Sequence, residues 1–166
     1  SWVRDQLKAG SAPLKAIGLD AHVGARWATP SPRKAVVILV VGETARAENF
    51  SLNGYPRETN PQLERENVIN FSDVYACGTS TAVSLPCMFS RQSRSDFDAD
   101  TSARSENLLD VLHHAGIPVL WRDNNSGCKG LCDRSDHEEF SPASDPRLCN
   151  GDECFDMVLM NQLEQK

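Results

Sequence analysis

The pattern of hydrophobic and polar positions predicts strands and helices in alternation along the middle of the chain. A continuous β-branched run fills 34–42 and ends in glycine, which is typical of a strand buried on both faces of a parallel sheet. Residues 68–75 alternate more loosely and predict a second strand. Residues 106–115 place four apolar side chains on one helical stripe before Gly116, and 117–121 follow as a third strand. This rhythm predicts an α/β fold with a mostly parallel sheet.

The two ends of the chain lack this rhythm. Residues 1–33 are polar, broken by prolines and glycines, and predict a linker with one short helix at 2–9. Residues 123–152 are rich in Asn, Ser, Gly and Asp, and predict loops held by cysteine bridges. A helical pattern returns at 156–165. We therefore expect 34–166 to be part of a larger doubly wound domain, because only three strands are evident.

Composition and charge narrow the class of protein. The chain of 166 residues is 40% hydrophobic and 24% charged, as in ordinary globular domains, and its formal net charge is −6. A net negative charge argues against a nucleic-acid partner, because proteins that bind nucleic acids normally carry a basic surface. The longest apolar run, 35–41, is far shorter than the roughly 20 residues that cross a bilayer, and no signal-peptide pattern opens the chain. We expect either a cytosolic protein or one whose upstream membrane segment is not part of this chain.

The cysteines decide between these compartments. The chain has six, which are Cys77, Cys87, Cys128, Cys132, Cys149 and Cys154. They fall into three close pairs, so three local bridges, 77–87, 128–132 and 149–154, are the economical prediction among the possible connectivities. The alternative is a four-thiolate zinc site made by the second and third pairs, although structural zinc sites favour tighter Cys-x2-Cys spacing. Three bridges indicate an oxidising, extracytoplasmic compartment.

Glu43 is the first candidate for chemistry. It directly follows the predicted strand 34–42, and ligands of open α/β sheets gather outside the carboxyl ends of strands. A carboxylate there could hold a metal ion. The alternative is that Glu43 simply opens the next helix, where the helix dipole favours an acid.

A second candidate is the hydroxyl cluster Thr79, Ser80 and Thr81, which lies between Cys77 and Cys87. A hydroxyl at a helix N-terminus meets free N–H groups that can bind a phosphate. It needs a base or a metal to act as a nucleophile, and no histidine is near in sequence, which favours a metal. The alternative is an ordinary threonine N-cap inside a disulfide loop.

Three separate blocks of sequence together carry a resemblance to a known family. The first reads Val-Gly-Glu-Thr-Ala-Arg-Ala-Glu-Asn-Phe over 41–50, with Leu-Asn-Gly-Tyr-Pro at 52–56. The second reads Cys-Gly-Thr-Ser-Thr-Ala-Val-Ser-Leu-Pro-Cys-Met-Phe-Ser over 77–90, and the third reads Trp-Arg-Asp-Asn-Asn over 121–125, continuing to Lys-Gly at 129–130. These blocks resemble the lipid A phosphoethanolamine transferase family, which includes the mobile colistin-resistance enzymes. The likeness runs from about residue 34 to the end of the chain. The chain is thus similar to the N-terminal half of the family's periplasmic catalytic domain.

The resemblance implies a fold and a location. The fold would be a partial alkaline-phosphatase/sulfatase-like α/β/α sandwich with a mostly parallel sheet and disulfide-pinned loops. The domain would lie on the periplasmic face of the Gram-negative inner membrane, tethered by an N-terminal transmembrane region that this chain lacks. The three cysteine pairs match disulfides of the family.

The resemblance also implies a reaction and its residues. Glu43 matches a Zn²⁺ ligand, and Thr81 matches the metal-activated threonine that carries phosphoethanolamine as a covalent intermediate. Thr79, Asn125 and Lys129 match positions that line the substrate pocket. The implied reaction moves phosphoethanolamine from phosphatidylethanolamine to a lipid A phosphate, which confers polymyxin and colistin resistance. One zinc ion touching Glu43 and Thr81 would place these side chains within about 5 Å of each other.

The chain departs from the family pattern in its metal ligands. The remaining ligands, an Asp-His pair and a further acid, would lie beyond position 166. Asp136, His137 and Glu138 resemble a replacement, but we interpret them as surface residues of the bridge-pinned loop. His22, His113 and His114 are likewise interpreted as linker or helix-surface residues. We therefore expect the isolated chain to bind zinc weakly or not at all and to be inactive alone.

Two other functions remain open from the sequence. One is another alkaline-phosphatase-superfamily phosphotransferase or a sulfatase, although no Cys/Ser-x-Pro-x-Arg pattern, typical of sulfatases, surrounds Thr81. The other is a disulfide-rich periplasmic module without catalysis.

Overall fold

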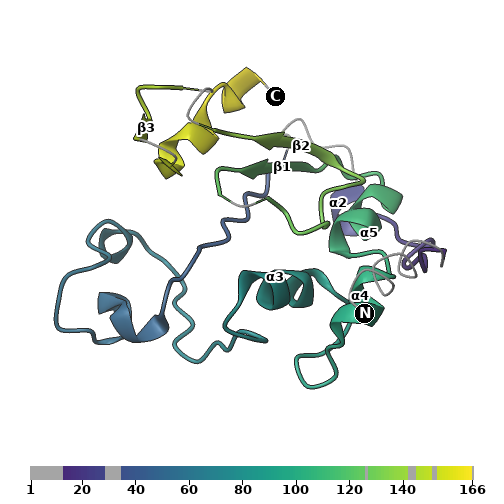
Figure 1. The fold of residues 1–166 in the computed structure, drawn as a ribbon, viewed down its shortest axis with the longest axis horizontal. Coiled ribbons are helices and arrows are strands. Elements are labelled where there is room, and N and C mark those ends of the chain that lie inside the picture. Colours follow the sequence, from purple (N-terminus) through teal and green to yellow (C-terminus); the bar gives the residue numbers. More distant parts are fainter. Residues whose placement is uncertain (1–12, 29–34, 126, 142–144, 151–152, 166) are drawn as a thin grey trace, which may run out of the picture. The chain divides into compact units, whose positions relative to one another are not determined.

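The computed structural model describes residues 13–28, 35–125, 127–141, 145–150 and 153–165. The chain divides into two compact units (Figure 1): Ser1–Pro30 with Cys77–Lys166 form the larger one, and Ser31–Ala76 form the smaller one. No helix in the described ranges is long and apolar enough to cross a membrane. The helix predicted at 2–9 lies outside these ranges.

A short parallel sheet lies in the larger unit. Strand β1 (Leu120–Asp123) pairs in parallel with β2 (Asp136–Glu139), and Leu120 lies opposite Asp136 (Figure 1). The strand predicted at 117–121 is therefore confirmed in type but begins three residues later. A second pair, β3 (Cys149–Asn150) and β4 (Glu153–Cys154), is antiparallel.

The prediction that 123–152 consists of loops is wrong at these strands. Strand β2 reads Asp-His-Glu-Glu, so no apolar alternation marks it. Its pairing comes from backbone hydrogen bonds to β1 and from an ion pair between Arg122 and Glu138, with 2.8 Å between Arg122 Nε and Glu138 Oε2. Hydrophobic patterning cannot reveal a strand held in this way.

Helices α3 (Thr81–Phe89), α4 (Ala99–Ala103) and α5 (Leu108–His114) precede the sheet in the sequence. Helix α5 confirms the prediction for 106–115. It begins with a capping box, in which Asn107 accepts from the Leu109 N–H at 2.8 Å and Asp110 accepts from the Asn107 N–H at 2.8 Å. Gly116, with φ of 74°, follows its last turn, where the left-handed conformation favours glycine.

The core of the larger unit joins α3, α5, β1 and the loop after β1. Its buried members are Leu85, Phe89, Leu109, Cys128, Leu131 and Cys132. Val119 and Trp121 pack against this cluster from the segment that forms β1. The core therefore fixes the helix that begins at Thr81 and the loop that carries Lys129 to one sheet.

The last segment differs from the prediction of one helix over 156–165. It forms two 3₁₀ helices, η4 (Asp156–Met160) and η5 (Leu163–Gln165), separated by Gln162 with φ of 54°. Val158 is fully buried, and Arg122 donates to the backbone oxygens of Leu159 and Asn161. These contacts hold the two 3₁₀ helices against β1, and the segment does not form a regular α-helix.

The smaller unit contains three 3₁₀ helices, η1 (Ala47–Asn49), η2 (Ser51–Asn53) and η3 (Leu63–Arg65). The strands predicted at 34–42 and 68–75 are wrong for the described residues, which form no strand there. Side chains of the apolar run are exposed, for example Val37 at 88%. Such a run becomes a strand only when neighbours satisfy its backbone and cover its side chains, and the described part of the chain supplies neither.

Part of the predicted linker packs on the larger unit. Helix α2 (Ala25–Ala28) lies in the predicted linker, and Lys15 of the same segment forms a parallel bridge with Ser105. The side chain of Val111 on α5 lies only 2.9 Å from where a Cβ on Gly18 would be, and Gly18 has φ of 64°. A glycine is required at this close approach.

Candidate active site

Thr81 is the first residue of α3. The preceding residue, Ser80, is extended and takes the N-cap position without a side-chain hydrogen bond, while its carbonyl accepts from Val83 at 3.0 Å and Ser84 at 2.8 Å. The alternative of an ordinary threonine N-cap at Thr81 is therefore wrong. Thr81 is half-buried and stands where the first backbone N–H groups of the helix have no intrahelical acceptor. A hydroxyl at this place can meet a bound phosphate.

The loop before α3 is closed into a ring by the Cys77–Cys87 bridge, whose Cα atoms lie 6.3 Å apart. Gly78 brings the loop against the helix, because a Cβ at this position would lie 3.1 Å from Val83 Cγ1. Thr79 lies in this ring and is exposed. The ring therefore limits the freedom of both candidate threonines.

All three predicted bridges are confirmed. Cys128 pairs with Cys132, and Cys149 pairs with Cys154, alongside the bridge that closes the α3 ring. No cysteine is free. The alternative of a four-thiolate zinc site is therefore wrong.

Asn125 and Lys129 lie in the loop that leaves the carboxyl end of β1. Asp123 shapes this loop, because its Oδ1 accepts from the Asn125 N–H at 2.8 Å and from the Gly127 N–H at 3.1 Å. Both Asn125 and Lys129 are exposed. The loop is anchored by the buried Cys128–Cys132 bridge, which packs in the same core as α3.

Lys129 has φ of 54°, a left-handed conformation that few non-glycine residues adopt. Thr44, the neighbour of Glu43, has φ of 51°, and it is β-branched, which makes this conformation a genuine outlier. Backbone strain of this kind concentrates at functional sites. Two of the three non-glycine residues with positive φ in the described ranges therefore lie at or beside a predicted site residue.

Glu43 is exposed and lies in the smaller unit. Thr44 Oγ1 donates a hydrogen bond of 2.8 Å to its Oε1. The next helix, η1, begins only at Ala47 and carries Glu48 in its first turn, so the alternative that Glu43 opens a helix is wrong. Because Glu43 and Thr81 belong to different units, the distance predicted between them stays a prediction.

Asp136, His137 and Glu138 lie on β2 and not in a loop, which corrects the placement given above. Successive side chains of a strand alternate between its faces, so His137 points opposite to both neighbours. In the described ranges, Cys128, Cys132 and Asp133 form the one group of three ligand-type side chains close enough to share a metal ion. Two of these three atoms are already joined in a disulfide.

Two charged pairs that involve α5 or its N-terminal flank were not predicted from the sequence. Asp110 on α5 accepts two hydrogen bonds from Arg134, at 2.6 and 2.7 Å. Burial alone would raise the pKa of Asp110, but the hydrogen bonds from Arg134 and from the Asn107 N–H outweigh it and leave the pKa below its ordinary value. The capping-box spacing from Asn107 to Asp110 was readable in the sequence, whereas the pairing with Arg134 was not.

The second pair corrects the interpretation of His114 as a simple surface residue. Its Nε2 lies 2.9 Å from Glu106 Oε2, and the same oxygen accepts from the Ile17 N–H at 2.9 Å. The hydrogen bond with His114, and after it the one from Ile17, lowers the pKa of Glu106. These contacts hold the segment around Ile17 against the start of α5.

Comparison with known proteins places these features in a family. The family model described as Sulfatase matches residues 35–166. The chain is 48% identical over 165 residues to phosphoethanolamine transferase EptA of Escherichia coli K12, covering 99% of this chain and 30% of that protein. It is 42% identical over 167 residues to phosphatidylethanolamine transferase Mcr-1 of Escherichia coli, covering 96% of this chain and 31% of that protein. The chain thus spans about 30% of the length of these relatives.

Solved structures agree with this placement. The lipooligosaccharide phosphoethanolamine transferase A of Neisseria meningitidis, an integral membrane protein, matches with a TM-score of 0.87 and 36% identity, over 99% of this chain and 30% of that one. The soluble domain of the same transferase matches with a TM-score of 0.81 and 37% identity, over 94% of this chain and 46% of that one. The predicted partial alkaline-phosphatase/sulfatase-like fold and the predicted resemblance are confirmed. The chain belongs to the sulfatase family.

Proposed function

We propose that this chain is the N-terminal half of the periplasmic catalytic domain of a phosphoethanolamine transferase. The complete protein would take phosphoethanolamine from phosphatidylethanolamine and pass it to a lipid A phosphate, at the periplasmic face of the inner membrane. The observation that carries the proposal is Thr81, whose hydroxyl stands at the N-terminus of α3 in a disulfide-closed ring. The names of the relatives supply the reaction class.

Thr81 would act as the nucleophile. Its oxygen would attack the phosphorus of the donor, and diacylglycerol would leave. The dipole of α3, whose positive end lies at Thr81, favours the negative charge of the phosphoryl oxygens. A second attack, by a phosphate of lipid A, would then release Thr81.

Lys129 and Asn125 would orient the phosphoryl group from the loop after β1. The Lys129 amine supplies positive charge and the Asn125 amide supplies a hydrogen-bond donor, both useful where phosphoryl charge builds up. Thr79 would contribute a hydroxyl from the α3 ring. The shared core fixes this loop and α3 to the same sheet, which supports their joint role.

The resemblance implies a Zn²⁺ ion, and the chemistry of Glu43 fits that ion. Carboxylate oxygen is an accepted zinc ligand, and the exposed side chain of Glu43 is oriented by Thr44. When bound, the ion would supply a Lewis acid that lowers the pKa of a hydroxyl such as that of Thr81. The remaining ligands would come from other parts of the complete protein.

A sulfatase is the second candidate function, because the matching family model carries that name. The segment from Thr81 to Leu85 reads Thr-Ala-Val-Ser-Leu and lacks the Cys/Ser-x-Pro-x-Arg pattern given above. We therefore favour phosphoryl transfer over sulfatase activity. A non-catalytic periplasmic module is the third.

The test uses the full-length protein expressed in cells. Thr81→Ala is expected to abolish transfer without loss of folding, and Thr81→Ser to retain part of it because the hydroxyl survives. Glu43→Ala is expected to match the loss in Thr81→Ala, since the metal would not be held. The measurements are the mass of lipid A and survival in polymyxin. Full activity of Thr81→Ala would refute the nucleophile, and normal activity of Glu43→Ala would refute the metal ligand.

A further inference from the structure

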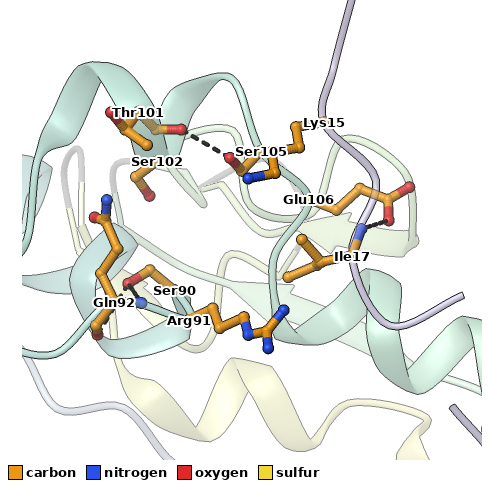
Figure 2. A pocket seen from close by; sticks show the side chains of 9 residues that line it. All are labelled: Lys15, Ile17, Ser90, Arg91, Gln92, Thr101, Ser102, Ser105 and Glu106. Atoms are coloured by element: carbon orange, nitrogen blue, oxygen red, sulfur yellow. Dashed lines mark hydrogen bonds between the residues drawn. The ribbon is translucent and has the colours of Figure 1, made fainter. Parts of the chain in front are cut away.

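We propose that a polar cavity at the far end of α3 binds a phosphorylated saccharide. The cavity has a volume of about 360 Å³ and lies entirely within the larger unit (Figure 2). This volume is at the lower end of the roughly 300–1,000 Å³ typical of small-molecule sites. Ser90, the C-cap of α3, lines it, so it lies one helix length, about 13 Å, from Thr81.

The wall of the cavity is built by backbone hydrogen bonds. Lys15 donates from its N–H to Arg104 O at 2.8 Å, and its carbonyl accepts from the Glu106 N–H at 2.9 Å. The Ile17 N–H then reaches Glu106 Oε2 at 2.9 Å. The segment that carries Lys15 and Ile17 is therefore held in place beside α4 and the start of α5, and the cavity is preformed.

The charges in the cavity favour an anion. Lys15 and Arg91 have no ion pair among the residues that the structure describes, and Figure 2 shows their side chains reaching in from two different walls. The one acid of the lining, Glu106, is already engaged at Oε2 by His114 and Ile17. Two cations without a neutralising partner suit the phosphate group of a ligand better than a metal cation or a neutral sugar.

The other lining groups favour a polyhydroxylated frame on that anion. Ser90, Thr101, Ser102 and Ser105 bring four hydroxyls, and Gln92 brings an amide. The hydroxyls of Ser90 and Ser105 already donate to the backbone oxygens of Gln92 and Thr101, so they are left to accept from hydroxyl groups of a ligand. The Gln92 Oε1 accepts from the Asp98 N–H at 3.0 Å, which leaves its NH₂ group to donate. Ile17 adds an apolar surface for the C–H face of a sugar ring. A bare phosphate would leave most of these groups unused.

The binding itself does not depend on the transfer reaction. Only one further step rests on the proposed function: in a transferase, this cavity would hold a saccharide phosphate of the acceptor away from the reacting atoms, where remote binding energy can be used for orientation. The ligand could be a free sugar phosphate or the headgroup of a glycolipid. Both share the chemistry that the cavity recognises.

The test titrates the 166-residue chain with glucose 1-phosphate, glucose and inorganic phosphate, and follows the amide resonances of Ser90, Ser102 and Ser105 by NMR. Glucose 1-phosphate is expected to shift these resonances at lower concentration than either glucose or phosphate. Equal affinity for inorganic phosphate, or no response to glucose 1-phosphate at millimolar concentration, would overturn the proposal.

Variants locate the binding. Lys15→Gln and Arg91→Gln keep the backbone bonds of the wall and are each expected to weaken binding by about tenfold or more, the value of a hydrogen bond to a charged group. Arg65→Gln, the same charge change in the smaller unit, and Thr81→Ala are expected to bind normally. Unchanged binding in both cavity variants would contradict the site, whereas loss of transfer in Thr81→Ala leaves it intact.

A final arm distinguishes the sources of the ligand. Micelles containing monophosphoryl lipid A are added to the complex with glucose 1-phosphate. Displacement of the sugar phosphate from the Ser102 resonance identifies a glycolipid headgroup as the ligand. Displacement by empty micelles as well would overturn the assignment, because it would show that the cavity binds detergent.

Discussion

Phe89 and Trp121 meet edge to face, with ring centroids 5.7 Å apart and an angle of 64° between the ring planes. Phe89 is the last residue of α3, and Trp121 lies on β1. This one contact therefore joins the helix that begins with the candidate nucleophile to the strand that leads into the Asn125–Lys129 loop. The geometry of the candidate site depends on an aromatic pair that itself takes no part in the chemistry.

Phe89→Ala is expected to destabilise the larger unit by about 3–5 kcal/mol, because it opens a cavity in the core and removes the aromatic contact. Phe89 is 3% exposed, so little of this cost can be recovered by solvation. The measurement is the free energy of unfolding in denaturant. Met88→Ala, at a neighbouring position that is 56% exposed, is the matched control and should stay within about 0.5 kcal/mol. Equal effects of the two substitutions would contradict the core assignment.

The ion pair between Asp110 and Arg134 predicts a loss of stability in acid. The folded-state pKa of Asp110 lies below its unfolded value, so its contribution is complete above about pH 4 and is lost as the pH falls through the folded pKa. Asp110→Asn should cost about 1–3 kcal/mol at neutral pH and flatten the acid limb of the stability curve. The measurement is unfolding free energy against pH. The exposed Asp20→Asn serves as control, and an acid limb unchanged in Asp110→Asn would contradict this role.

Lys129 predicts a separation of stability from activity. At most positions a protein with glycine is less stable than the same protein with alanine. At Lys129, where φ is 54°, the glycine variant should instead be the more stable by about 1 kcal/mol, because glycine adopts this conformation without strain. Both Lys129→Gly and Lys129→Ala should lose transfer activity in the full-length protein, since both remove the amine. Thermal unfolding of the pair checks the order. A Lys129→Ala variant more stable than Lys129→Gly would show that the backbone is not strained there.

The exposed apolar run at 36–41 predicts self-association of the chain on its own. Val36, Val37 and Val40 are each at least 80% exposed, and the run combines high β-propensity with no charge. Val37→Lys should reduce association without lowering the stability of the larger unit. Sedimentation velocity over a range of concentrations measures this, with Gln62→Lys, at an exposed position outside the run in the same unit, as the comparison. A monodisperse monomer at high concentration would contradict the prediction.

The sequence was informative where structure is local. Helix α5 was predicted because its apolar stripe and Gly116 lie close together in the sequence, and the bridges because each cysteine has a near neighbour. The strands at 34–42 and 68–75 were not predictable in the same way, because a strand forms only with partners, and these can be far away in the sequence. Strand β2 was hidden for the opposite reason, since its polar side chains are stabilised by Arg122 across the sheet.

The residues of the candidate site also differ in whether the local sequence predicts them. Thr81 at a helix start follows from its local sequence, and the roles of Asn125 and Lys129 came only from the resemblance. The pairing of Asp110 with Arg134 spans 24 residues and leaves no periodic signal. The cavity beyond Ser90 was equally hidden, because its lining residues come from three separate segments whose approach depends on the hydrogen bonds of Lys15 and Ile17.

The three bridges have a consequence for proteolysis. Each closes a small ring, so a single cut between Cys77 and Cys87, between Cys128 and Cys132, or between Cys149 and Cys154 leaves both new ends covalently attached. A cut within 35–76 falls outside every ring and separates the chain into two fragments. Nicked protein of the first kind therefore migrates as an intact chain on a gel until a reductant is added, whereas the second kind falls apart in denaturant alone.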